Sequence, residues 1–386
     1  MTLLRSVSIV GIGILPVRKT ADTDLRQMAA SAVQAAMDNA GIQQVDALYA
    51  SNMLSDELQG QKHLGALIAD EAGLRSIEAL HIRAATASGA AALRVAYLAV
   101  ASGAVDRAVA VGVEKMSQGP VTQALSKALD AEVDLAQGAT MISRNAEIMQ
   151  RYLDHYQLPE DALADFAVNA HDNAQTTDHA IFRARSVSRE DVMTSRMVHA
   201  PIRLYDCSPI CDGAAAVVLV PTASATKQHD MPIQILGSSV VTDRFRLQDR
   251  QDPLQLQAAD LSVKQAMRQA QVTLTDIDLF ELHDAFSIIA CLSLEAAGFA
   301  PPGEGWRLAR EGAIRRSGRI PIATMGGLKA RGHPIGATAL YQAAEIALQL
   351  RAQAGNNQID GARVGMMQSV GGVASTVITH ILGISW

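Results

Sequence analysis

Residue types that can do acyl chemistry gather in four short stretches of the chain, which are "TASG" at 86–89, "HDAFS" at 283–287, "GGLKARGHPIGATA" at 326–339 and "SVGG" at 369–372. Two of these stretches carry the histidines His283 and His333, whose rings can accept a proton or donate a hydrogen bond near neutral pH. The other two begin with the hydroxyl residues Thr86 and Ser369. Imidazoles and hydroxyls of this kind can serve as bases, donors and nucleophiles.

Thr86 stands where a β-leaning segment runs into an Ala-rich helical segment at 88–100. The N–H groups at the start of a helix point outward, so this junction suits a nucleophile or an anion. Thr is also a preferred N-cap residue, and we interpret Thr86 as a cap or packing residue rather than a covalent catalyst.

The other candidates also have structural alternatives. His333 lies between a glycine and a proline, where the backbone is strained. A histidine with only a packing role is not expected at such a position, and we predict a functional role for it. His283 follows an apolar run at a strand end, where functional and structural roles are equally compatible with the pattern. We interpret Ser369 as a backbone hydrogen-bonding residue. Gly371 and Gly372 permit either tight packing or the close approach of a ligand.

Composition excludes several classes of function. The 386 residues are 49% hydrophobic, 19% charged and 4% aromatic, with a net charge of −6, which argues against nucleic-acid binding and disorder. The cysteines Cys207, Cys211 and Cys291 make neither a disulfide framework nor a zinc site, so we expect buried or cleft-lining thiols and no metal. Without a signal-peptide layout or an apolar membrane span, a cytoplasmic location is expected.

An internal repeat organises the elements that must position these residues. "SAVQAAMDNAGI" at 31–42 resembles "LSVKQAMRQAQV" at 261–272, and "SGAAAL" at 88–93 resembles "IGATAL" at 335–340. Each copy places a helix before a short apolar strand. Alternating strands and helices predict an α/β fold with two βαβαβ halves, parallel-rich sheets and a pseudo-twofold axis.

We predict domain limits from where this repeat is interrupted. Residues 119–203 are richer in polar and charged residues and lack convincing strands, which indicates an inserted loop subdomain. The N-terminal half then comprises 1–118 and 204–225, and the C-terminal half comprises 226–386. The four chemical stretches end strands or open helices, so one shared site is expected at the strand ends.

The same stretches carry a resemblance to a known family. "DGAAAVVL", "HDAFS", "GGLKARGHPIGATA" and the closing glycines resemble the thiolase superfamily over nearly the whole chain, with the sterol-carrier-protein-2 type and acetyl-CoA acetyltransferases as the nearest branch. The resemblance implies a layered αβαβα core, a coenzyme A thioester as substrate and no covalently bound cofactor. It also implies a homodimer or tetramer, and in this branch a small zinc-ribbon/OB-fold partner.

The resemblance also implies roles for individual positions. In the family, a cysteine at the position of Thr86 is the nucleophile, and the histidine matching His333 activates it. A second cysteine, at the position of Ser369, moves the α-proton. The histidines matching His283 and His333 stabilise the thioester oxygen. Backbone amides at the nucleophile and near Gly371 and Gly372 form a second oxyanion hole.

This chain departs from the family at both cysteines, and the departure decides the predicted reaction. A hydroxyl must lose its proton during attack, whereas a thiol ionises near pH 8.5. Acyl transfer to Thr86 would give an oxyester, which is less electrophilic than the thioester it came from. Ser369 has no pKa near neutrality for proton transfer. We therefore predict thioester-enolate chemistry, retro-aldol cleavage or decarboxylation, in place of thiolysis or Claisen condensation. The alternative is a non-catalytic acyl-CoA-binding or assembly subunit.

Overall fold

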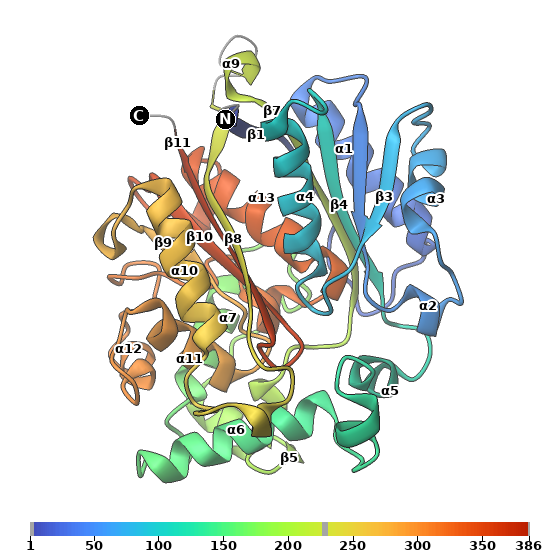
Figure 1. Ribbon diagram of the computed structural model, residues 1–386. Helices are drawn as coiled ribbons and strands as arrows, with labels where there is room; N and C mark the ends of the chain where they lie inside the picture. Colours follow the sequence, from blue (N-terminus) through green and yellow to red (C-terminus); the bar gives the residue numbers. More distant parts are fainter. Residues whose placement is uncertain (1–3, 226–230, 385–386) are drawn as a thin grey trace.

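One mixed sheet runs through the whole computed structural model, which describes residues 4–225 and 231–384 (Figure 1). Its strand order is β3 (Glu78–Ile82), β2 (Ala47–Ser51), β4 (Ala108–Lys115), β7 (Asp212–Pro221), β1 (Val7–Ile14), β8 (Ile233–Thr242), β11 (Thr376–Ile384), β10 (Val364–Gly371) and β9 (Leu279–Glu281). The five strands from β3 to β1 belong to the first half of the chain, and the four from β8 to β9 to the second.

The two halves of the sheet have equivalent strand orders, counted from its centre to each edge. From β1 the neighbours are β7, β4 and β2, and from β8 they are β11, β10 and β9, as a pseudo-twofold axis between β1 and β8 requires. The two central strands pair at only two positions, Ser8 with Gln234 and Ile9 with Ile233, so the half-sheets can diverge beyond this contact.

The expectation of parallel-rich sheets is wrong in part. Parallel pairing occurs between β2 and β3, β2 and β4, and β9 and β10, whereas the pairings from β4 through β7, β1, β8 and β11 to β10 are antiparallel. Strand β7 of the first half and strand β11 of the second half each run antiparallel to both of their neighbours. The repeat alone does not reveal that direction.

Helices cover the half-sheets in layers, which confirms the α/β fold with an αβαβα core. Helix α1 (Leu25–Ala40) packs on strands of the first half, and α10 (Gln257–Ala270) packs on β8 and β11 of the second. Helices α4 (Ser88–Ser102) and α13 (Thr338–Leu350) contact strands of both halves and each other, so they form the middle layer. The repeated sequences thus form equivalent helices.

Close approach of the two middle helices requires a residue without a side chain. A Cβ atom added to Gly89, at the start of α4, would lie 2.8 Å from the carbonyl oxygen of Gly336, just before α13. Such a contact with backbone atoms cannot be relieved by a rotamer change. The glycines of "SGAAAL" and "IGATAL" therefore bring the two helix starts together, and with them the loops that carry Thr86 and His333.

Residues between β4 and β7 leave the sheet and form the lower part of the molecule in Figure 1. They fold into α5 (Val121–Ser126), α6 (Met141–His155), α7 (Ala164–Ala174), α8 (Arg189–Thr194) and a two-stranded sheet of β5 (Met197–His199) and β6 (Ile202–Arg203). The domain limits proposed from the sequence stay a prediction, and residues 226–230 and 385–386 lie outside the described residues.

The remaining helices are short or lie at the edges, and are α2 (Ser55–Leu58), α3 (Leu64–Glu71), α9 (Thr222–Ala225), α11 (Ser287–Ala297) and α12 (Gly305–Arg310). Among the described residues, the segment Ala85–Ser102, which includes α4, is long and apolar enough to cross a membrane, and 56% of it is buried inside the molecule. Its packing on β2, β4 and α13 is that of a core helix.

Candidate active site

The loop that carries Thr86 joins β3 to α4 through a strained turn. Ala85 has a φ of +48°, a left-handed conformation that non-glycine residues seldom adopt. The Ser88 hydroxyl accepts a hydrogen bond from the Ala84 N–H at 2.9 Å and donates one to the Ala85 carbonyl at 2.6 Å. These two bonds hold the turn that precedes the helix.

Thr86 does not cap α4, and the capping interpretation is wrong. The N-cap residue is Ala87, which makes no side-chain cap. The Thr86 hydroxyl instead donates to the carbonyl oxygen of Val370 at 2.5 Å, and the residue is 9% exposed. Thr86 is therefore a buried packing residue whose only hydroxyl proton is already committed to the backbone of β10.

Ser369 is fully buried on β10, next to the residue that Thr86 contacts. Its hydroxyl donates to Oε1 of Gln342 at 3.4 Å. The Gln342 amide in turn donates to the carbonyls of Glu281 and Leu282, at 3.0 and 2.9 Å. Ser369 thus hydrogen-bonds as expected, although to a side chain rather than to backbone, and Gln342 links it to the loop that carries His283.

His283 and His333 meet at the strand ends, as one shared site requires. Their rings lie edge to face, with centroids 5.2 Å apart and planes at 88°. His283 follows the end of β9, and His333 lies just before α13. The two residues are only 4% and 5% exposed, so little solvent reaches their rings.

Burial keeps both imidazoles neutral. It lowers the pKa of His283 to about 3. Burial also lowers the pKa of His333, and the neighbouring His283 and the Arg331 guanidinium lower it further. At neutral pH each ring therefore carries one proton and one lone pair, so the pair can supply a base and a hydrogen-bond donor.

Buried ionic groups hold the loop that leads to His333. The Asp284 carboxylate accepts from the Leu328 N–H at 2.8 Å, and Lys329 donates to the Asp206 carbonyl at 2.5 Å. The fully buried Arg331 lies 3.3 Å from Glu345, whose other oxygen is 2.8 Å from His179. The position of His333 therefore depends on charges that water does not reach.

A further buried carboxylate anchors the far side of the same loop. Glu114, at the end of β4, accepts hydrogen bonds from the N–H groups of Gly336 at 2.9 Å, Leu54 at 3.0 Å and Met53 at 2.9 Å. Burial raises the pKa of this carboxyl to about 7. Glu114 ties the "GHPIGA" loop of the second half to the first half of the sheet.

The closing glycines allow the two halves of the site to touch. A Cβ atom on Gly371 would lie 2.7 Å from the Ala84 carbonyl, and Gly372 has a φ of +61°. Arg250 donates to the carbonyl of Val373 and is 8% exposed, so it holds this turn from outside. Tight packing thus accounts for Gly371 and a left-handed turn for Gly372, and their part in an oxyanion hole stays a prediction.

None of the three cysteines takes over the missing thiol chemistry. Cys211 lies closest to the histidines, since its sulfur accepts a hydrogen bond from the His333 N–H at 3.2 Å. Burial raises the pKa of Cys211 to about 12 and that of Cys207 to about 11. Cys291 is buried beside Tyr152 and Glu295. All three thiols therefore stay protonated at neutral pH.

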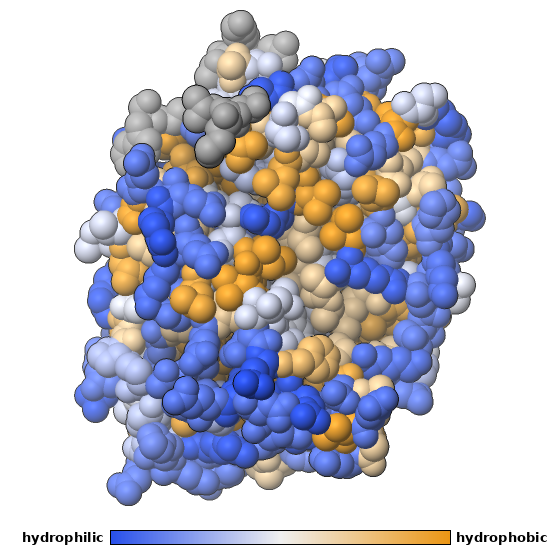
Figure 2. All heavy atoms as spheres, viewed as in Figure 1, coloured by the Kyte–Doolittle hydropathy of each residue, from blue (hydrophilic) through white to orange (hydrophobic). Residues whose placement is uncertain are grey.

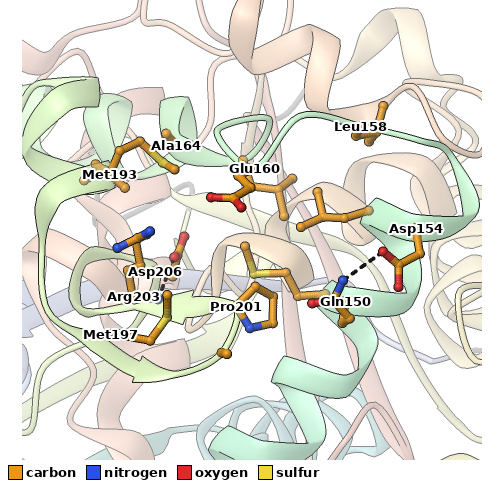
Figure 3. Close-up of a pocket in the computed structure, with 15 residues that line it drawn as sticks. Gln150, Asp154, Leu158, Glu160, Ala164, Met193, Met197, Pro201, Arg203 and Asp206 are labelled. Atoms are coloured by element: carbon orange, nitrogen blue, oxygen red, sulfur yellow. Dashed lines mark hydrogen bonds between the residues drawn. The ribbon is translucent and has the colours of Figure 1, made fainter.

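Two cavities lie in the inserted segment. One of about 660 Å³ is lined by residues of 119–140 and by Ile210, the residue before Cys211. A second, of about 330 Å³, lies between α6, α8 and the β5–β6 sheet and is lined by Met149, Met193 and Met197 (Figure 3). Asp206 lines the second cavity, and its carbonyl accepts a hydrogen bond from Lys329 of the loop that leads to His333.

Sequence reasoning missed the groups that position the two histidines. These groups are polar or charged residues within apolar segments, namely Gln342, Glu114 and the Arg331–Glu345 pair. The sequence does not distinguish such buried residues from polar residues that face solvent. Sequence reasoning missed Thr338 as well, although its position five residues after His333, in the same motif, is a signal that could have identified it, because its hydroxyl contacts the His333 ring.

Comparisons with known proteins identify the relatives of this chain. Family models for the thiolase N-terminal domain and the thiolase C-terminal domain-like region match residues 7–223 and 239–384. An acetyl-CoA acetyltransferase of Methanothermobacter thermautotrophicus is 40% identical over 381 residues, covering 98% of this chain and 99% of its own. Sterol carrier protein 2 of Bos taurus is 28% identical over 392 residues, covering 97% of this chain and 71% of its own.

Solved structures show the same fold. The structure of an Ltp2–ChsH2(DUF35) aldolase superposes with a TM-score of 0.87 at 23% identity and covers 98% of each chain. The acetyl-CoA acetyltransferase from Syntrophomonas wolfei superposes with a TM-score of 0.76 at 17% identity, covering 98% of this chain and 99% of its own.

Proposed function

The chain belongs to the thiolase superfamily, and we propose that it acts on acyl-CoA thioesters by generating an enolate without a covalent acyl-enzyme. The acetyltransferase relatives support the class of substrate. The lack of cysteine at positions 86 and 369 separates the proposed reaction from acyl transfer. Retro-aldol cleavage of a β-hydroxyacyl-CoA is the reaction we favour. Decarboxylation of an acyl-CoA that carries a carboxylate on its α-carbon would form the same thioester enolate, with the electrons of the broken carbon–carbon bond moving to the thioester carbonyl as CO2 leaves.

One observation carries the proposal. The two neutral imidazoles lie in edge-to-face contact at the strand ends, whereas the hydroxyls of Thr86 and Ser369 are bound to Val370 and Gln342. A nucleophilic threonine needs a base that takes its proton, and the Thr86 proton is directed at a carbonyl oxygen, which cannot remove it. The imidazoles that can take a proton and donate a hydrogen bond to an oxyanion remain, and the groups that form an acyl-enzyme do not.

The proposed reaction uses the histidines as a base and a donor. One imidazole removes the proton from the β-hydroxyl of the substrate. The Cα–Cβ bond then breaks, its electrons move to the thioester carbonyl, and an aldehyde or ketone leaves. The other imidazole donates a hydrogen bond to the enolate oxygen, which is the charge that develops in the transition state. Return of the proton to the α-carbon gives the shortened acyl-CoA.

We propose that the 660 Å³ cavity is the route by which the thioester reaches the histidines. Ile210 lines the cavity, and the adjoining Cys211 contacts the backbone of His333. The cavity has mainly apolar walls, which suit the apolar arm of a ligand, and Lys127, whose ammonium pairs with Glu57, is among its lining residues. A coenzyme A thioester has such an arm.

Two kinds of protein partner are part of the proposal. Figure 2 shows apolar atoms gathered on the face that α4 and β8 present, where Leu98 is 38% and Val240 42% exposed, and we propose that a second copy of the chain covers it. The aldolase with the TM-score of 0.87 is named as a pair of components, which supports a second protein partner here. The zinc-ribbon/OB-fold type and the cytoplasmic location stay predictions.

The two reactions can be separated in one experiment. The purified chain is incubated with acetoacetyl-CoA and CoA, and separately with a β-hydroxyacyl-CoA. We expect release of an aldehyde or ketone in the second mixture and no acetyl-CoA in the first. Acetyl-CoA formation at ordinary thiolase rates would contradict the proposal. Tight CoA binding with no turnover in either mixture, with or without a partner, would identify a binding subunit instead.

A further inference from the structure

We infer that Thr338 fixes the tautomer of His333 and thereby makes His333 the base of the histidine pair and His283 the donor. The inference concerns how the two rings divide their roles, and its catalytic meaning rests on the proposed function. Thr338 is the first residue of α13 and is 1% exposed. It acts through His333 and is therefore a positioning residue.

The argument begins with the two contacts of the Thr338 hydroxyl. Its oxygen lies 2.6 Å from Nδ1 of His333 and 3.1 Å from the carbonyl oxygen of Pro334. A hydroxyl has one proton to donate, and a backbone carbonyl can only accept. If the proton were directed at Nδ1, the hydroxyl and carbonyl oxygens would face each other at 3.1 Å with no hydrogen between them, which is repulsive.

Only one assignment satisfies both contacts. The hydroxyl donates to the Pro334 carbonyl, as Ser and Thr side chains often do four residues back along a helix, and accepts from Nδ1–H of His333. Since the ring is neutral, Nε2 of His333 then carries the lone pair. This nitrogen makes no hydrogen bond with any residue in the described part of the chain, so it is free to take a substrate proton.

His283 has the opposite assignment. Its Nδ1 is buried and has no hydrogen-bond partner among the described residues. An unpaired buried N–H is rarer in proteins than an unpaired acceptor, so the single proton of the neutral ring belongs on Nε2. His283 is therefore an Nε2–H donor. The two rings, in contact at 5.2 Å, are held in complementary tautomers, one that accepts a proton and one that donates a hydrogen bond.

In the proposed cleavage, this division determines the path of the proton. His333 Nε2 takes the β-hydroxyl proton and becomes an imidazolium, which keeps its Nδ1–H on Thr338. The enolate oxygen accepts a hydrogen bond from Nε2–H of His283. The proton on His333 is then available for the α-carbon, so the ring returns to its starting tautomer and no external acid is needed.

The test is a ¹⁵N NMR spectrum of chain labelled at histidine, recorded without substrate. The two signals are assigned by their loss in His283→Gln and His333→Gln variants. We expect a protonated Nδ1 and an unprotonated Nε2 for His333, and the reverse for His283. Thr338→Val removes the acceptor but keeps the shape, and we expect His333 to change to the Nε2–H tautomer while His283 keeps its signal. Thr338→Ser is the matched control and should keep the wild-type spectrum.

Activity gives a second readout. We expect kcat for β-hydroxyacyl-CoA cleavage to fall about 100-fold in Thr338→Val, the range of a lost general base, with little change in KM, and to be largely retained in Thr338→Ser. A wild-type His333 protonated at Nε2, or a Thr338→Val spectrum identical to wild type, would overturn the inference. Because the spectra need no turnover, they decide it even if the chain cleaves no β-hydroxyacyl-CoA.

Discussion

Replacement of His333 by alanine is expected to lower kcat for β-hydroxyacyl-CoA cleavage by about 10²–10⁴-fold, the range attributed to one general base. The ring lies in contact with His283, and burial keeps it neutral and able to accept a proton. Its Nδ1 is occupied by Thr338, which leaves Nε2 for the substrate. The measurement is the steady-state release of the aldehyde or ketone product.

Loss of activity in this variant must be separated from loss of fold. Thermal unfolding of His333→Ala shows whether the chain still folds at the assay temperature. His199→Ala changes an exposed histidine of β5 and should leave the rate unchanged. A folded His333→Ala chain that cleaves the substrate at the wild-type rate would remove the histidine from the mechanism.

Replacement of Glu345 by glutamine is expected to have the largest effect on stability, a loss of about 3–5 kcal/mol in the free energy of unfolding. Arg331 and Glu345 are both fully buried, with their charged atoms 3.3 Å apart. Glutamine has nearly the same shape but removes the carboxylate that lies beside the arginine charge, away from water. Denaturant unfolding of the variant and the wild type measures the difference.

A surface ion pair provides the matched control for this prediction. Lys264 and Asp260 are 2.6 Å apart on α10, and their side chains are 64% and 36% exposed. Asp260→Asn should cost no more than about 0.5 kcal/mol, because solvent screens the pair. If Glu345→Gln were as stable as Asp260→Asn, the buried pair would not hold the His333 loop in the way described.

The fold could be predicted from the sequence where its signal is periodic. The matching helices at 31–42 and 261–272 indicate two related halves, and the structure confirms them as α1 and α10. The direction of β7 and β11 could not be predicted, since it depends on pairing between strands far apart in the chain. The apolar pattern of a buried strand is the same in parallel and antiparallel sheets.

Only those residues of the candidate site that lie in recognisable sequence motifs could be predicted. His283 and His333 were identified from their stretches, and the structure brings them together. The role expected of Thr86 as a cap failed because the left-handed turn at Ala85 moves the N-cap to Ala87, and no sequence pattern predicts a left-handed alanine. Gln342 reaches backbone 60 residues away, a contact that only the tertiary fold creates.

Intact-protein mass spectrometry during turnover tests the central claim most directly, namely that the site stabilises a thioester enolate but forms no acyl-enzyme. The chain is quenched while it turns over a β-hydroxyacyl-CoA, and separately while it is mixed with acetoacetyl-CoA and CoA. We predict the unmodified mass in both samples, together with release of an aldehyde or ketone in the first. An acyl adduct mapped to Thr86 in either sample would contradict the account.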